Sequence, residues 1–137
     1  MTPSLACLAL AVYFEARGEP VIGQYAVAQV VVNRAEDPAF PDSICAVIHQ
    51  GGEAKIGGCQ FSFFCDGKSD RPYNKKAWDD AQAVAESVLL KGARLSELDG
   101  ALWYRAVWIN PPAWTAGLER KAVIGAHVFY GRKKPPD

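Results

Sequence analysis

The segment AVYFEARGEPVIGQYAVAQVVVNR, residues 11–34, contains two helical patterns separated by a short charged break. Apolar residues recur at helical spacing before the break, at Leu5, Leu8, Ala9 and Val12. This spacing predicts an amphipathic helix over about residues 3–17, and Gly18 suits its end. After the break, Val27, Val30 and Val31 have the same spacing. We therefore expect a second helix that has Pro20 in its first turn and Arg34 near its end.

The rest of the chain predicts a third and a fourth helix and a small amount of strand. Ser43 is a good N-cap for a short helix through about His49, and Asn74 for a long helix to about Lys91. Residues 50–73 read as a long loop, with a short strand or extended segment in CQFSFFCDG. ALWYRAVWI and HVFYG are expected to be strands, with a turn at NPPAW. The fold class is α+β, mainly α, in a single domain over residues 1–137.

Composition and charge exclude several classes of protein. Lys+Arg and Asp+Glu number 15 each, so there is no basic field to attract nucleic acid, and GRKKPP near the end reads as a solvated basic tail. No apolar run approaches the roughly 20 residues that span a bilayer. The first residues lack the basic region and cleavage site of a signal peptide, so we assign them to the first helix. We expect a monomer that neither binds nucleic acid nor inserts into a membrane.

The four cysteines do not have the spacing of a metal site. None forms a CxxC pair, and neither histidine stands at ligand spacing from them. Cys7 falls among apolar helix positions and is expected to be a buried free thiol. Cys45, Cys59 and Cys65 bracket one loop, so a single disulfide among these three is expected if the protein works outside the cytosol.

Glu15 stands where the apolar stripe of the first helix reaches the helix end. It follows Val12 by three residues, so its carboxylate faces the core side and loses water. Burial and the partial negative charge of the helix end both raise a glutamate pKa, as a general acid near neutral pH requires. From spacing alone, a structural carboxylate that caps or pairs with Arg17 or Arg34 is the commoner outcome. Glu19 is expected to be a first-turn acid of the second helix.

Three blocks of sequence resemble a known family. LALAVYFEARGEPVIGQYAVAQVVVNR, CQFSFFCDGKSD and IGAHVFY are similar to the cell-wall hydrolase family of the spore-cortex-lytic enzymes, of SleB/CwlJ type, over about residues 5–131. The resemblance implies a lysozyme-like fold with a small β element beside a substrate groove, and cleavage of peptidoglycan glycan strands. It places the catalytic acid at the first glutamate of the EARGE block, which is Glu15. We expect no cofactor and no metal.

A glycan groove combines aromatic faces with polar groups that bind hydroxyl and N-acetyl groups. The segment QFSFFCDG supplies this mixture, and substrate contacts are expected from Gln60, Phe61, Ser62, Phe63 and Asp66. Tyr104 is expected to position an N-acetyl group or to stabilise charge near C1. Arg105, on the same wall, stands where the family commonly has a histidine. The tryptophans at 103, 108 and 114 are expected to be core residues.

The number of available carboxylates bears on the reaction. Glycosidases ordinarily use two, and the partners on offer for Glu15 are Asp66 and Glu19. A lytic transglycosylase needs one acid, which protonates the glycosidic oxygen and then deprotonates the C6 hydroxyl that attacks C1 of the same muramic acid. We therefore expect cleavage between MurNAc and GlcNAc that leaves a 1,6-anhydro sugar. A hydrolytic muramidase using Asp66 and a non-catalytic glycan-binding module are the alternatives.

Such a protein acts in the periplasm or cell wall. A catalytic domain without a signal peptide fits a phage endolysin released by a holin-type pore. It fits equally a domain trimmed from a secreted protein.

Overall fold

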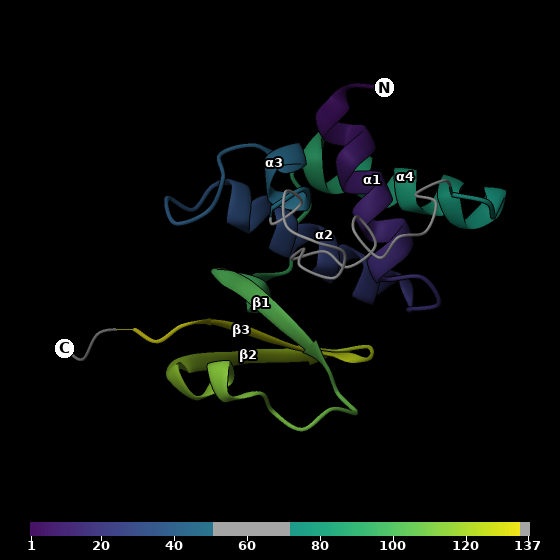
Figure 1. The fold of residues 1–137 in the computed structure, drawn as a ribbon. Helices are drawn as coiled ribbons and strands as arrows, with labels where there is room; N and C mark the ends of the chain where they lie inside the picture. The colour runs from purple at the N-terminus through teal and green to yellow at the C-terminus, as the bar shows by residue number, and fades with distance from the viewer. Residues whose placement is uncertain (51–71, 135–137) are drawn as a thin grey trace.

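A computed structural model describes residues 1–50 and 72–134. Within these ranges the helices are α1 (Pro3–Glu15), α2 (Val21–Ala35), α3 (Ile44–Ile48) and α4 (Lys75–Leu89). The strands are β1 (Ala101–Ala106), β2 (Leu118–Ile124) and β3 (His127–Arg132), and short 3-10 turns are η2 (Ser96–Leu98) and η3 (Ala113–Gly117). The helices gather on one side of the molecule and the sheet lies against them (Figure 1). The prediction of a mainly helical α+β fold is confirmed.

Side-chain caps define where three helices begin. Thr2 accepts a hydrogen bond from Leu5 N before α1, at 3.3 Å. Ser43 and Asn74 accept bonds from the third residue of α3 and α4, as the sequence predicts. α1 ends at Glu15, and Gly18 then turns the chain with a φ of 84°. The predicted helices therefore form, with ends shifted by one or two residues in most cases.

α2 is the central helix of the domain. Nine of its fifteen residues are buried, because valine and alanine occupy almost every face of it. Ala28 and Val31 pack into a cluster with α1, α3 and α4. Ala26 and Val30 pack instead with Leu98 and with residues of the sheet. α2 thus lies between the other helices and the strands, and both layers are fixed to it.

The sheet is antiparallel in the order β1-β3-β2, so β3 is its central strand. β2 was not predicted from the sequence. Its residues, LERKAVI, carry three charges and are mostly half-exposed, so they lack the apolar alternation that marks a strand. β1 ends at Ala106, earlier than expected. Trp108 beyond it is 75% exposed and Trp114 is 46% exposed, so neither is the core residue that we expected.

A disulfide joins Cys7 on α1 to Cys45 on α3. The expectation that Cys7 is a free thiol is therefore wrong. Of the pairings expected among Cys45, Cys59 and Cys65, the two that include Cys45 are wrong as well. The pairing follows from the packing of α3 against α1, which brings together residues 38 positions apart. The predicted strand in CQFSFFCDG, with Cys59 and Cys65, lies outside the described residues. Within the described ranges, no helix is both long and apolar enough to cross a membrane.

Removing the Cys7–Cys45 disulfide should destabilise the domain. Closing a loop of 38 residues restricts the unfolded chain by about 4 kcal/mol in the chain-entropy account, which is an upper estimate. Replacing both cysteines with alanine should therefore lower the free energy of unfolding by up to this amount in urea titration. Adding a reductant should lower the free energy of unfolding of the wild-type protein towards that of the double variant. Equal stability of the two proteins under oxidising conditions would show that the bond does not constrain the unfolded chain.

Candidate active site

Glu15, the last residue of α1, faces the first strand of the sheet. Leu8 and Val12 fix this face of α1 in the core, so the helix carries the partly buried Glu15 side chain inward as predicted. The hydroxyl of Tyr104 on β1 donates a hydrogen bond to Glu15 Oε1 at 3.3 Å. An acid from the helical layer and a phenol from the sheet therefore meet where the two layers come together.

The pKa of Glu15 is raised above its ordinary value. Burial is the largest cause, because it penalises the charged carboxylate. The hydrogen bond from Tyr104 and the charge of Arg34 act in the opposite direction and offset part of the effect. Arg17, the other partner considered from sequence, is exposed and lies over the ring of Tyr13, 4.9 Å from its centroid. The net environment favours a protonated carboxyl, which is the form that a general acid needs.

Tyr104 and Arg34 are held firmly around this acid. Burial and the neighbouring Glu15 carboxylate raise the pKa of Tyr104 well above 10, so its hydroxyl stays a neutral donor. Arg34 is 5% exposed, and its Nε donates to the carbonyl of Leu102 at 2.7 Å. Burial lowers the pKa of Arg34, while Tyr104 and Glu15 oppose that shift. A guanidinium remains charged under such conditions, so Arg34 is a fixed positive charge behind the acid.

Glu19 has a different environment from the one that we predicted. It precedes α2, and its carboxylate accepts hydrogen bonds from Ala126 N at 3.0 and 3.2 Å, in the turn between β2 and β3. Oε1 also lies 3.0 Å from His127 Nδ1, although the two atoms are not aligned for a hydrogen bond. Gly125 in this turn has a φ of 58°, and a Cβ there would come within 2.7 Å of Glu19 Oε2. Glu19 therefore ties the α1–α2 corner to the sheet.

The two carboxylates are connected through two aromatic rings. The ring of His127 meets that of Tyr104 edge-on, with centroids 4.9 Å apart. Burial lowers the pKa of His127, and the charge of Glu19 partly opposes this. His127 thus packs as a mainly neutral ring between Glu19 and Tyr104 near neutral pH. Because Glu19 is committed to the turn, Glu15 is the carboxyl group in this cluster that is free to transfer a proton.

The structure brings together only part of the predicted site. Gln60, Phe61, Ser62, Phe63 and Asp66 lie outside the described residues, so their roles stay predictions. Tyr104 lies at the acid as expected. Arg105 is on the opposite face of β1, where its Nε donates to the hydroxyl of Tyr130 at 2.9 Å and its Nη1 to the carbonyl of Ile109 at 3.1 Å. The structure does not bring Arg105 to Glu15.

Sequence reasoning did not assign Arg34 and His127 to the site. The signal for Arg34 is a charged residue within a helix that is apolar on nearly every face, since such a side chain must find partners inside the protein. The signal for His127 is its place in the IGAHVFY block, directly after the glycine turn. Among residues 1–50 and 72–134, no group of three or more His, Cys, Asp or Glu side chains is arranged to hold a metal ion.

The fold and this glutamate-centred site define a class of cell-wall enzyme domains. The chain belongs to the Cell Wall Hydrolase family, whose sequence profile matches residues 18–130. The match begins three residues after Glu15, so the placement of the acid depends on the EARGE motif and on the geometry described above.

Curated relatives and solved structures are spore cortex-lytic proteins of bacteria. The chain is 35% identical over 122 residues to the spore cortex-lytic enzyme of Bacillus subtilis (strain 168) and 54% identical over 127 residues to that of Oceanobacillus iheyensis. Each alignment covers 89% of this chain but only 35% and 39% of those relatives.

The fold is that of solved SleB catalytic domains. The catalytic domain of the Bacillus cereus SleB protein has a TM-score of 0.69 at 28% identity, covering 93% of this chain and 88% of that one. The catalytic domain of the germination-specific lytic transglycosylase SleB from Bacillus anthracis has a TM-score of 0.71 at 27% identity, covering 95% of both.

Replacing Tyr104 with phenylalanine should move the pH dependence of lysis. The hydroxyl of Tyr104 lowers the pKa of Glu15, so its loss should raise that pKa further. An acid that must be protonated loses activity as the pH rises through its pKa, and the alkaline limb of the pH–rate profile should shift to higher pH. Tyr130→Phe, on the opposite face of the sheet, is the matched control. A limb that stays in place or moves to lower pH would contradict the contact.

Proposed function

We propose that this domain cleaves peptidoglycan glycan strands between MurNAc and GlcNAc as a lytic transglycosylase, with Glu15 as its single catalytic acid. The observation that carries the proposal is the partly buried Glu15 carboxyl, with raised pKa, beside a neutral phenol donor. Family membership and the similarity to a SleB lytic transglycosylase support the same reaction.

The proposed reaction uses Glu15 twice. Protonated Glu15 gives its proton to the glycosidic oxygen, and the bond from C1 to that oxygen breaks. The resulting carboxylate then takes the proton of the C6 hydroxyl as its oxygen attacks C1 of the same sugar. The carboxylate formed between these steps is stabilised by the Tyr104 hydroxyl and by the charge of Arg34. The engagement of Glu19 with the β2–β3 turn supports a mechanism without a second carboxylate.

The biological setting follows from the relatives. They are bacterial proteins described as spore cortex-lytic enzymes, so we propose action on the bacterial cell wall or spore cortex. They give no support to the endolysin hypothesis. The chain spans little more than a third of the curated relatives, so this proposal concerns the domain alone.

Glu15→Gln should separate catalysis from folding. Lysis should fall by at least ~100-fold, the low end for loss of a general acid. The raised pKa means that the folded protein favours neutral Glu15, so its ionisation costs stability as the pH rises through that value. At pH 7 the melting temperature of the variant should therefore equal or exceed that of the wild-type protein. At pH 4 the variant should show no increase in melting temperature over the wild-type protein. Activity within a few-fold of wild type would remove Glu15 from the reaction and favour a glycan-binding module.

The products should distinguish the two mechanisms of cleavage. A transglycosylase leaves 1,6-anhydro-muramic acid termini, each about 18 Da lighter than a hydrolysed terminus because one water is not added. Mass spectrometry of digested peptidoglycan measures this directly. Reducing termini in the wild-type digest, together with loss of activity in Asp66→Asn, would identify a two-carboxylate muramidase instead.

A further inference from the structure

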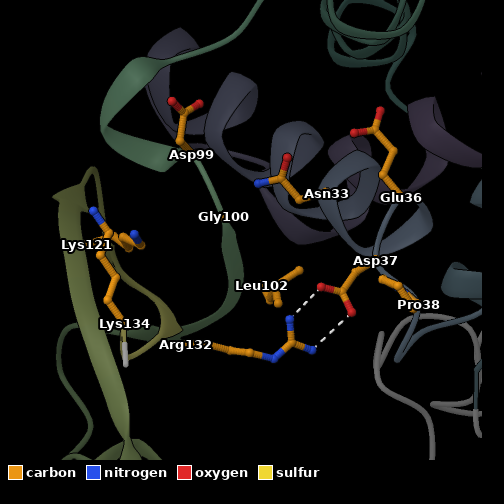
Figure 2. Close-up of a pocket in the computed structure, with 10 residues that line it drawn as sticks. All are labelled: Asn33, Glu36, Asp37, Pro38, Asp99, Gly100, Leu102, Lys121, Arg132 and Lys134. Carbon is orange, nitrogen blue, oxygen red and sulfur yellow. Dashed lines mark hydrogen bonds and ion pairs between the residues drawn. The ribbon is translucent and has the colours of Figure 1, made fainter. Parts of the chain in front are cut away.

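A cavity lies near the end of α2, where this helix approaches the strands. Its volume is about 480 Å³. Figure 2 shows its lining, which comes from the end of α2 and the residues after it, the start of β1 and the segment that enters it, the middle of β2 and the end of β3. Glu15 and the other residues of the acid cluster are not part of this lining. The cavity therefore requires a separate explanation.

Two irregularities of the sheet build one side of this cavity. Leu102 in β1 and Lys121 in β2 are the extra residues of two β-bulges, on either side of the central strand β3. Bulges commonly redirect a side chain near a functional site. On β3, a Cβ at Gly131 would lie 2.7 Å from Lys121 Cε and 2.7 Å from the carbonyl oxygen of Gly100. The bare glycine thus lets the Lys121 side chain cross β3 into the cavity.

The cavity carries charges of both signs on different sides. Figure 2 shows Lys121 and Lys134 on the strand side, Glu36 just after α2 and Asp99 on the segment that enters β1. Glu36 is largely exposed and lies 3.9 Å from Arg94 in a long ion pair. Lys121 is 17% exposed and pairs with Glu119 at 3.1 Å. Within the described part of the chain, Asp99 has no ion-pair partner. Separated ammonium and carboxylate groups suit a ligand that itself carries both charges, and they give no advantage to a neutral sugar.

Asp37 and Arg132 hold the two sides of the cavity together. The guanidinium of Arg132 donates to both carboxylate oxygens of Asp37, at 2.5 and 3.0 Å, and this pair joins the end of α2 to β3 (Figure 2). A bidentate pair fixes both the distance and the orientation of its partners. The two sides of the cavity, and the charges that they carry, are therefore held in a fixed relative position.

The cavity and Glu15 both contact β1, at residues two positions apart. Leu102 lines the cavity and precedes Tyr104 by two residues, which is about 7 Å along a strand. Its carbonyl also binds Arg34, the charge behind the acid. A peptide of three residues spans about 10 Å when extended. A short peptide attached to the sugar at Glu15 can therefore reach the cavity.

We propose that this cavity binds the peptide stem of peptidoglycan. This proposal rests on the proposed function. Stem carboxylates lie towards Lys121 and Lys134, and the ammonium group of the stem's diamino acid lies towards Asp99 and Glu36. The site gives the domain a preference for glycan strands that carry stems.

The test compares soluble glycan strands that carry stems with the same strands after an amidase has removed them. The wild-type protein should show the higher kcat/KM on stem-bearing strands. Lys121→Met and Asp99→Asn should each reduce kcat/KM on these strands by about 5-fold, the upper range for one partly exposed ion pair, without changing cleavage of bare strands. Lys133→Met and Asp42→Asn, at exposed residues outside the cavity, are the matched controls and should change neither.

A binding measurement separates this proposal from the proposed function. Titration calorimetry with an N-acetylmuramyl tripeptide ending in diaminopimelic acid should show weaker binding by both cavity variants and unchanged binding by both controls. Equal wild-type kcat/KM on the two substrates, or binding that neither cavity variant weakens, would overturn the stem site and leave strand cleavage standing. Specific binding without cleavage of either substrate would overturn the proposed function and support the site.

Discussion

Hydrogen bonds from α2 to the backbone that leads into β1 are the constraint on which the site depends. The donors are the side-chain amides of Gln29 and Asn33 and the guanidinium of Arg34. The acceptors are the carbonyls of Leu95, Leu98, Ala101 and Leu102, and Gln29 also accepts from the amide of Leu95 at 2.7 Å. Polar side chains in so apolar a helix are stable only when they are bonded in this way. Because these bonds fix the start of β1, they also fix Tyr104 against the end of α1.

Two glutamates four residues apart show how environment divides the roles of identical side chains. Glu15 ends a helix, is partly buried and receives one long hydrogen bond, so its neutral form is favoured. Glu19 lies past the helix break and accepts two bonds from one backbone amide, which suit a carboxylate. The break at Gly18 separates these environments, since a continuous helix would place both side chains on the same face. The EARGE motif therefore combines an acid with an anchor for the sheet.

Local sequence patterns predict the helices and the position of the acid. Contacts between segments that are distant in the sequence could be identified only from the structure. Helical spacing and caps identify α1 to α4, and the same spacing turns Glu15 inward. β2 escapes prediction because three of its seven residues are charged, and it becomes a strand only by pairing with β3. The Cys7–Cys45 pairing depends on how α3 packs against α1, which periodicity does not determine. The contact of Glu15 with Tyr104 spans 89 positions and likewise follows from packing.

β3 connects the acid cluster to the cavity near the end of α2. His127, Phe129 and Gly131 alternate onto the face that meets the helices, with His127 against Tyr104 and Phe129 fully buried between the two sites. At each end, a missing side chain admits a charged group from another element: Glu19 at Gly125 just before the strand, and Lys121 at Gly131. A Cβ at either glycine would meet that group at 2.7 Å. The central strand thus places one charge beside His127, whose ring packs on Tyr104, and another in the cavity, while its buried middle keeps both ends at a fixed separation.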